Sequence, residues 1–339
     1  MSDYMKAIVI REFGGPDVLR CEDMPIPVPA VGEILLKVDA VSVNRTLDLA
    51  VRAGRYARLP SLPHVLGTDP AGSIVALGEG VTSRRIGDRV TTSPRVKDGT
   101  ATQPPVMLGV GVWGGYAQYV TLPAKNTHLI PDSMDFVTAT IVGRHAPLAI
   151  NQLQEKAQLK AGEWVLVMGA SGGLGSAAVQ IAKYFGANVI AAAGADERVK
   201  AATELGADFG VNYRTHHLAE EVRRLTDGRG VDIVLENVGD PDLFPKALAS
   251  LARNGRMVTA GAHAGGTVSL DLNRLYLNYL TIIGSTHHTD RDIELSLKIA
   301  SEGHLDVLID ELMPLADAEA AHILVESRAG VGKVVLKPW

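Results

Sequence analysis

The feature that most constrains the fold is a glycine-rich turn between an apolar strand and a helix. The pattern predicts a strand over Trp164–Met168, a helix over Leu174–Phe185 and a second strand over Asn188–Ala193, in the order of a βαβ unit. Such a turn lets backbone N–H groups and the positive helix end meet a pyrophosphate with no side chain in the way. A strand-to-helix turn that binds nothing is the alternative. The residues expected to bind a dinucleotide are Ala170, Ser171, Gly172, Gly173, Leu174 and Gly175.

The composition excludes several other classes of protein. A chain of 339 residues is too long for one ordinary core, so we expect two domains. The net charge of −5 offers no basic surface for nucleic acid or for an anionic membrane. No apolar run reaches the roughly 18 residues that a membrane span requires, and the N-terminus lacks a secretory pattern. The single cysteine, Cys21, excludes an internal disulfide and a cysteine-rich zinc site. We therefore expect a cytoplasmic enzyme with a small-molecule substrate.

The pattern of expected secondary structure changes near Pro131. Residues 6–120 read as short strands and turns, interrupted by the long loop Ser93–Gly115, and predict a β-rich, partly barrel-like domain. After Pro131 helices, beginning with Met134–Ile141 and Pro147–Ala157, alternate with apolar strands. That alternation predicts an α/β unit with a doubly wound parallel sheet.

The end of the second strand of this sheet bears on the choice of cofactor. Proteins that bind NAD place a carboxylate there for the ribose hydroxyls, whereas Ala191–Ala195 is small and neutral. Asp196 follows, but we interpret it as an acid in the first turn of a helix. Lys183, Arg198 and Arg328 are cations that suit a 2′-phosphate, although each alone is typical of a solvated surface charge. Together these features favour NADPH.

An ordered set of motifs along the chain resembles one enzyme family. The motifs are Gly14–Leu19, Ser42–Asn44, Leu66–Gly72, Gly87–Val90, Gly114–Ala117, Ala170–Gly175, Asn212–Tyr213 and Glu326–Arg328. The set resembles the zinc-free quinone oxidoreductase (zeta-crystallin-like) and alkenal reductase branch of the medium-chain dehydrogenase/reductase superfamily. The resemblance covers nearly the whole chain. It implies a GroES-like catalytic domain of residues 1–142 and 288–339, a Rossmann domain of residues 143–287, and a homodimer or homotetramer.

The resemblance also bears on metals. Metal-dependent members would have cysteine near position 44 and His-Glu at positions 68 and 69, whereas this chain has Asn44, Thr68 and Asp69. An amide and a hydroxyl group are poor zinc ligands, and one carboxylate cannot hold zinc alone. The loop Ser93–Gly115 has the length of the lobe that carries a structural zinc in relatives, yet it contains no cysteine. We expect no metal at either place.

Some site residues are implied only by the resemblance. Lys183, Tyr213 and Arg328 match residues that contact the 2′-phosphate end of NADPH, while Asn44 and Tyr56 match polar residues beside the nicotinamide and the substrate.

The chain also departs from the family pattern near the expected substrate. The stretch Asn44–Asp48 is one residue longer than in the quinone reductases, a second tyrosine is replaced by Ala50, and Leu148 stands where relatives have a threonine. These departures leave the substrate less defined than the cofactor.

The expected chemistry is hydride transfer from NADPH to an acceptor that spreads charge itself, a quinone or an α,β-unsaturated carbonyl compound. The Asn44 amide and the Tyr56 hydroxyl are the expected hydrogen-bond donors to the forming oxyanion. His145 is either the proton donor or a structural histidine of the cleft. Two alternatives stay open: a zinc-free NADPH-dependent carbonyl reductase or alcohol dehydrogenase, and a non-catalytic NADPH-binding module that senses redox state.

Overall fold

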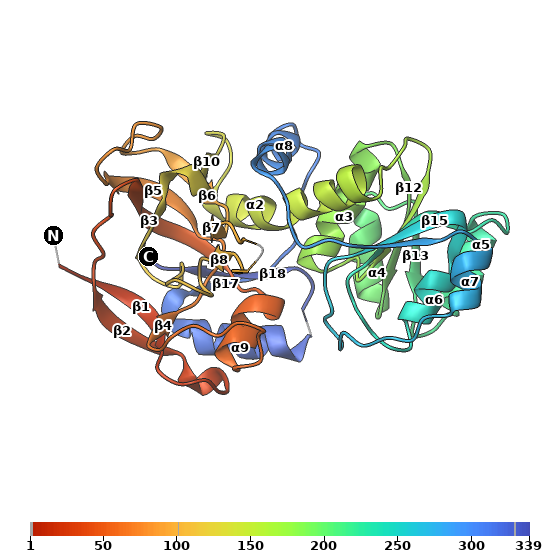
Figure 1. Ribbon diagram of the computed structural model, residues 1–339, viewed down its shortest axis with the longest axis horizontal. Helices are drawn as coiled ribbons and strands as arrows, with labels where there is room; N and C mark the ends of the chain where they lie inside the picture. The colour runs from red at the N-terminus through yellow and green to blue at the C-terminus, as the bar shows by residue number, and fades with distance from the viewer. Residues whose placement is uncertain (1–2, 101, 329) are drawn as a thin grey trace. The chain divides into compact units, whose positions relative to one another are not determined.

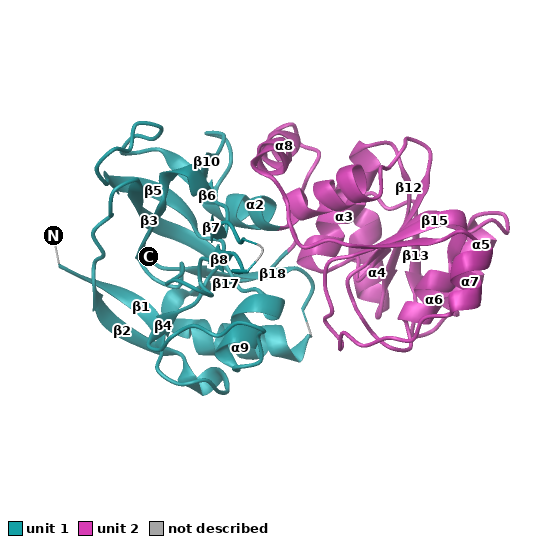
Figure 2. Cartoon of the chain, in the orientation of Figure 1, with its two compact units in different colours: residues 1–144, 309–339 teal, residues 145–308 magenta. Residues whose placement is uncertain are grey.

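The computed structural model describes residues 3–100, 102–328 and 330–339 (Figure 1). The chain forms two compact units, shown in different colours in Figure 2. Unit 1 contains residues 1–144 and 309–339, and unit 2 contains residues 145–308.

Unit 1 is built from β-strands. One sheet has the order β2-β1-β4, a larger one runs β10-β6-β5-β3-β18-β17 with β9 also paired to β3, and β7 pairs with β8. The strands are β1 (Tyr4–Ile10), β2 (Arg20–Pro25), β3 (Glu33–Ser42), β4 (His64–Val65), β5 (Ala71–Leu77), β6 (Arg89–Thr92), β7 (Arg95–Lys97), β8 (Val106–Met107), β9 (Tyr119–Pro123), β10 (Thr127–Leu129), β17 (Ile309–Pro314) and β18 (Lys333–Lys337). The helical segments are η1 (Pro16–Val18), η2 (Arg45–Leu49), α1 (Ala50–Arg52), η3 (Ala124–Asn126), η5 (Leu315–Asp317) and α9 (Ala318–Ser327).

Strand β3 organises the core of unit 1, because it pairs with β5, β9 and β18. Ile34, Leu36 and Val38 are fully buried in the hydrophobic core. Where β5 crosses β3 the backbones approach so closely that a Cβ atom on Gly72 would lie 1.9 Å from the carbonyl oxygen of Lys37. Only glycine fits there. This packing fixes the end of β3, from which Asn44 follows.

Unit 2 contains a parallel sheet with the strand order β13-β12-β11-β14-β15-β16. The strands are β11 (Trp164–Met168), β12 (Asn188–Ala193), β13 (Phe209–Asn212), β14 (Val231–Glu236), β15 (Leu251–Thr259) and β16 (Thr281–Gly284). The helical segments are η4 (Asn151–Lys156), α3 (Gly173–Tyr184), α4 (Asp196–Glu204), α5 (Leu218–Leu225), α6 (Phe244–Ala249), α7 (Leu272–Leu277) and α8 (Asp290–Ser301). The strand order reverses at β11, where doubly wound sheets bind their ligands. The predicted fold class, a GroES-like β-rich part with a Rossmann sheet, is confirmed.

One expected break in the chain is absent. The two helices expected over Met134–Ile141 and Pro147–Ala157 form one helix, α2 (Phe136–Ile150), which continues into the π-helical segment η4 with Pro147 inside it. Ala139, Ala146 and Ala149 of this helix are completely buried. Tertiary packing of this face outweighs the local cost of the proline.

The second boundary between the units also differs from the expected one. It lies at residues 308/309 rather than 287/288, so α8 belongs to unit 2 and does not return to the β-rich part. The reason is a set of hydrogen bonds within unit 2. Gln180 of α3 accepts from the backbone N–H of Asp306 and donates to its carbonyl oxygen, and Asn151 donates to the carboxylate of Asp292.

Across the described ranges, no helix has both the length and the apolar character needed to cross a membrane.

Candidate functional site

The glycine turn of unit 2 has the geometry that its sequence predicts. Gly169 follows β11 with a φ of +66°, and Gly172 caps helix α3 in an extended conformation. A Cβ atom on Gly175 would lie 2.2 Å from the carbonyl oxygen of Gly169, so helix and strand could not pack as they do. One on Gly173 would lie 2.6 Å from Nε2 of His145. The turn therefore depends on glycine for close packing.

The same turn fits a pyrophosphate group. Gly172 is exposed and carries no side chain, so no side chain at this position caps the amides of the first turn of α3. The positive end of the helix adds to their attraction for an anion. The structure brings the six predicted turn residues, Ala170–Gly175, together at the carboxyl end of β11.

The carboxyl end of β12 carries no carboxylate. The backbone N–H of Tyr213 donates to the carbonyl of Ala193, and a Cβ atom on Gly194 would lie 3.0 Å from the Tyr213 hydroxyl oxygen. Asp196 lies in the first turn of α4 and accepts a 2.7 Å hydrogen bond from Asn212, as expected of a helix acid. Arg198 follows in the same helix. Tyr213 and Arg198 thus lie at the edge where the adenosine end of a dinucleotide would bind.

Lys183 does not lie at that edge. It stands in the last turn of α3 and donates to both carboxylate oxygens of Asp208 at 2.8 Å. Asp208 also accepts from the backbone N–H of Val189, at the beginning of β12. Lys183 is therefore at the amino edge of the sheet, opposite to the edge that binds nucleotides in such folds. Its expected role at the 2′-phosphate has no support in this geometry.

A group of buried polar atoms near the carboxyl ends of β14 and β16 was not found from the sequence. Asn237 accepts from the backbone N–H of Ala260 and from Gln152 Nε2. However, Asn237 Nδ2, Gln152 Oε1 and Ser285 Oγ are buried without a hydrogen-bond partner among the described residues. Buried polar atoms normally have partners, so their presence here fits the carboxamide end of a nicotinamide. Asn237 and Ser285 stand at the ends of apolar strand patterns, and this position was the sequence signal that could have identified them.

In unit 1 a buried polar cluster includes Asn44, Thr68 and Asp69. These are the positions at which metal-dependent members of the family would have metal ligands. Asn44 Nδ2 donates to Asp69 Oδ2 at 2.8 Å and makes a longer contact of 3.3 Å to Thr68 Oγ1. The hydroxyl of Ser42 donates to the same carboxylate at 2.6 Å. Asn44, Thr68 and Asp69 are at most 4% exposed. The structure thus brings these residues together, bonded to one another.

Lys333 and Asp48 complete this cluster, and neither was singled out from the sequence. Lys333 Nζ donates to Asn44 Oδ1 at 3.0 Å and to the carbonyl oxygen of Val43 at 2.6 Å. Asp48 accepts from the backbone N–H groups of Asn44 and Gly67. Burial, with a smaller contribution from the Asp69 carboxylate, raises the pKa of Asp48 to about 7, although these two hydrogen bonds and Lys333 lower it. Burial lowers the pKa of Lys333 to about 8.

A directed chain of hydrogen bonds leads from Asp48 to the far side of the core. The Tyr116 hydroxyl donates to Asp48, and His322 Nε2 lies 3.2 Å from that hydroxyl. Arg52 approaches His322 Nδ1 and forms an ion pair with Glu326. Because a guanidinium group only donates, Nδ1 accepts and the imidazole proton sits on Nε2. Burial, with a smaller contribution from Arg52, lowers the pKa of His322 to about 3.

The segment Asn44–Asp48, which the resemblance suggests is one residue longer than in the quinone reductases, contains a π-helical turn. The segment η2 (Arg45–Leu49) is a π-helix, which holds one more residue in a turn than an α-helix. The wider turn lets the Asp48 carboxylate reach back to the backbone N–H of Asn44 at 2.7 Å. The expected insertion is thus absorbed beside the polar cluster.

The remaining predicted site residues lie in their separate units. Tyr56 of unit 1 packs half-buried against the hydrophobic core, and its hydroxyl has no hydrogen bond within the residues the structure describes. Arg328 ends helix α9 in a left-handed conformation and lowers the pKa of Arg45, although burial lowers it more. His145 of unit 2 packs its ring against Gly173, at the start of α3. Its place fits a structural histidine of the glycine turn, and a role as proton donor stays a prediction.

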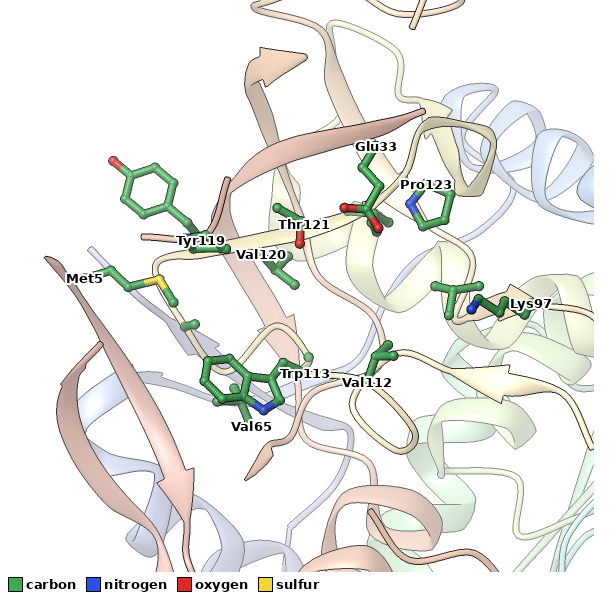
Figure 3. A pocket seen from close by; sticks show the side chains of 15 residues that line it. Met5, Glu33, Val65, Lys97, Val112, Trp113, Tyr119, Val120, Thr121 and Pro123 are labelled. Carbon is green, nitrogen blue, oxygen red and sulfur yellow. The ribbon is translucent and has the colours of Figure 1, made fainter. Parts of the chain in front are cut away.

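Two further observations concern unit 1. No group of three or more His, Cys, Asp or Glu side chains within the described ranges could hold a metal ion. A pocket of about 260 Å³ lies along β9, and Figure 3 shows Trp113, Met5 and Tyr119 around it. Lys97 and Val112 of the Ser93–Gly115 loop also line it. Neither Asn44 nor Tyr56 takes part, so this pocket is distinct from the polar cluster.

Two family models match this chain. The model described as "Alcohol dehydrogenase GroES-like domain" matches residues 30–132, and the one described as "Zinc-binding dehydrogenase" matches residues 173–302. The quinone oxidoreductase of Homo sapiens is 32% identical over 340 residues, which cover 98% of this chain and 97% of the relative. An NAD-dependent alcohol dehydrogenase of Sulfolobus acidocaldarius is 34% identical over 349 residues, which cover 98% of this chain and 99% of the relative.

Solved structures agree with these matches. The crystal structure of an NAD-dependent alcohol dehydrogenase superposes with a TM-score of 0.93 at 36% identity, covering 99% of this chain and 100% of that one. A mycobacterial quinone oxidoreductase superposes with a TM-score of 0.84 at 32% identity, covering 98% of this chain and 100% of that one. The chain therefore belongs to the medium-chain dehydrogenase/reductase superfamily, oxidoreductases that use a nicotinamide cofactor.

Proposed function

We propose that this chain is a zinc-independent oxidoreductase that transfers a hydride from NADPH to a quinone or to an α,β-unsaturated carbonyl compound. The observation that carries the proposal is the polar cluster of unit 1. Asn44, Thr68 and Asp69 are bonded to one another and, through Asn44, to Lys333, so they offer no set of nitrogen or sulfur donors to zinc. Relatives named quinone oxidoreductase support this acceptor class.

The residues of unit 1 suit acceptors that delocalise their own charge. When bound, the reduced nicotinamide would supply the hydride, and a proton from a side chain or water would complete the reduction. The Tyr56 hydroxyl and the second N–H of the Asn44 amide would donate to the acceptor oxygen as negative charge develops. Both groups are placed by packing, Tyr56 against the core and Asn44 within its cluster.

Three features of unit 2 support NADPH over NADH. The end of β12 has Gly194 in place of a carboxylate, and the ring of Tyr213 packs against it. Arg198 follows in α4, where a guanidinium group could pair with a 2′-phosphate. Hypothesis: NADPH binds at least about ten-fold more tightly than NADH. A fluorescence titration in which NADH binds as tightly as NADPH would refute this part of the proposal.

The second candidate function is a zinc-free carbonyl reductase or alcohol dehydrogenase. A relative named NAD-dependent alcohol dehydrogenase, at 34% identity, favours keeping it. A panel of a quinone, an enone, a simple ketone and an alcohol, each followed by nicotinamide absorbance, separates the two. Turnover of only the ketone and the alcohol would replace the first proposal by the second. NADPH binding without turnover of any compound would favour the non-catalytic module.

Two substitutions test the donors in unit 1. With an α,β-unsaturated ketone, Tyr56→Phe and Asn44→Ala should each lower turnover by about ten-fold or more, while NADPH affinity changes little. Tyr4→Phe is the matched control, because Tyr4 is 59% exposed on β1. Unchanged turnover in both variants would remove these two residues from the mechanism.

We also propose a homodimer, or a homotetramer built from it, in solution. Strand β16 is an edge strand of the sheet in unit 2. Beside it, Leu272, Tyr276 and Leu277 of α7 expose more than half of their surface. Apolar side chains gathered beside an unpaired strand edge favour pairing with another copy. Sedimentation at micromolar concentration should give a dimer or tetramer mass, and a monomer would contradict the proposal.

A further inference from the structure

Lys333 is buried deep in unit 1 and does not pair directly with a carboxylate. It lies on β18, is 8% exposed, and donates through Nζ to two carbonyl oxygens, those of Val43 and of the Asn44 side chain. Lysine is almost never this buried unless a specific contact compensates the lost hydration. The contact with Asn44 spans 289 positions in the sequence. A buried ammonium group held on two neutral carbonyl oxygens calls for a functional reason.

The contacts at Asn44 fix the orientation of its carboxamide. An ammonium group only donates, so the atom that Lys333 contacts at 3.0 Å is the carbonyl oxygen. A carboxylate accepts, so the atom that Asp69 contacts at 2.8 Å is the amide nitrogen. The other contacts of this nitrogen are longer: 3.3 Å to Thr68 Oγ1 and to the carbonyl oxygen of Ser42, and 3.4 Å to Ser42 Oγ. One N–H is held tightly, and the other can donate elsewhere.

We propose that Lys333 is a positioning residue that orients and polarises the Asn44 carboxamide, so that its second N–H stabilises the developing oxyanion of the acceptor. This inference rests on the proposed function and deepens it. A positive charge bonded to an amide oxygen draws electron density from the amide nitrogen, which strengthens its N–H as a donor. The low dielectric of the buried site enlarges the effect. The chain itself thereby supplies a cation beside the reacting groups.

The charged groups around Lys333 support this role. Asp69 and Asp48 raise the pKa of the ammonium group, while burial, the largest effect, and Arg144 lower it, with a result of about 8. The lysine is therefore charged at neutral pH and loses its charge in mildly alkaline solution. Polarisation of Asn44 should weaken over the same range.

The first experiment removes the positive charge of Lys333. Lys333→Met should lower kcat for quinone reduction at pH 7 by at least about ten-fold, with KM and the Kd for NADPH within about two-fold of wild type. Lys337→Met is the matched control, because Lys337 lies exposed on the same strand. An unchanged kcat in Lys333→Met, or an equal loss in Lys337→Met, would overturn the proposal.

A second variant keeps the charge and remains informative even if Lys333→Met does not fold. Wild-type kcat should decline above about pH 8, where Lys333 loses its proton. In Lys333→Arg the decline should disappear up to about pH 10, because a guanidinium group stays protonated. A decline at the same pH in both proteins would show that another group causes it and would overturn the proposal.

A double-mutant cycle and one spectroscopic measurement separate this proposal from the proposed function. If Lys333 acts through Asn44, the double variant Asn44→Ala/Lys333→Met should be no slower than the slower single variant, whereas multiplied losses would contradict the proposal. Independently of activity, the Asn44 Nδ2 signals in a ¹⁵N NMR spectrum should shift as the pH passes about 8 and should not shift in Lys333→Arg. A wild type that reduces no acceptor but shows this shift would refute the proposed function alone. Absence of the shift would refute the role of Lys333.

Discussion

Two groups of buried polar side chains, the polar cluster around Asn44 in unit 1 and the group around Asn237 in unit 2, differ in how their hydrogen bonds are satisfied. In the polar cluster of unit 1, the amide of Asn44, the carboxylates and the ammonium group are bonded to side chains and backbone of the chain itself. In unit 2, Asn237 Nδ2, Gln152 Oε1 and Ser285 Oγ have no such partner among the described residues, and no side chain at Gly172 caps the first turn of α3. The difference indicates that the polar cluster of unit 1 is organised before any ligand binds, whereas the group around Asn237 fits a ligand that supplies the missing partners.

The largest expected effect comes from adding a charge to the glycine turn. Gly172→Asp places a good capping residue at the N-terminus of α3, so the unfolding free energy without cofactor should stay equal or rise. The same carboxylate repels a pyrophosphate, so NADPH should bind at least about 100-fold more weakly. Urea unfolding and a fluorescence titration check the two halves. Unimpaired NADPH binding would place the cofactor away from this turn.

The second prediction concerns pH and the chain of hydrogen bonds in unit 1. The pKa of His322 is about 3 in the folded protein. Below about pH 6.5 the unfolded chain therefore takes up a proton that the folded chain does not, and the unfolding free energy decreases as the pH is lowered. His322→Gln can keep both hydrogen bonds without titrating. Between pH 6.5 and 5, wild type should lose about 2 kcal/mol more unfolding free energy than this variant. Equal losses in urea titrations at the two pH values would contradict the placement of His322.

The third prediction compares two cations of unit 2. Arg198→Ala should weaken NADPH binding by about ten-fold and NADH binding by less than about two-fold, because only NADPH carries the 2′-phosphate. Lys183→Ala should change neither, since Lys183 pairs with Asp208 at the amino edge of the sheet. Paired titrations of both cofactors test this. The reverse result would restore the role that the sequence assigned to Lys183.

The smallest expected effect concerns one of the buried atoms without a partner. Ser285→Ala removes a buried hydroxyl that has no hydrogen bond, so the protein without cofactor should become more stable by up to about 1 kcal/mol. If a ligand satisfies that hydroxyl, NADPH binding should weaken a few-fold at the same time. A loss of stability in Ser285→Ala would show that the hydroxyl is satisfied within the protein.

Sequence alone predicted what depends on local pattern. The glycine turn, the strands at Trp164–Met168 and Asn188–Ala193, and the place of Asp196 at a helix start follow from neighbouring residues. Lys333 and His322 were missed, because their partners Asn44 and Arg52 lie 289 and 270 positions away. Lys183 was assigned to the 2′-phosphate from the resemblance and its charge, although a helix that begins at the glycine turn carries its last turn to the opposite edge of the sheet.

The central claim is that unit 1 works through its own hydrogen-bond donors, with Lys333 as the built-in cation. The most direct test is steady-state oxidation of NADPH by a quinone, before and after chelation, with the metal content of the same samples measured by mass spectrometry. The account predicts the same kcat in protein that holds far less than one metal ion per chain. Activity that disappears on chelation and returns with one equivalent of Zn²⁺ would contradict it.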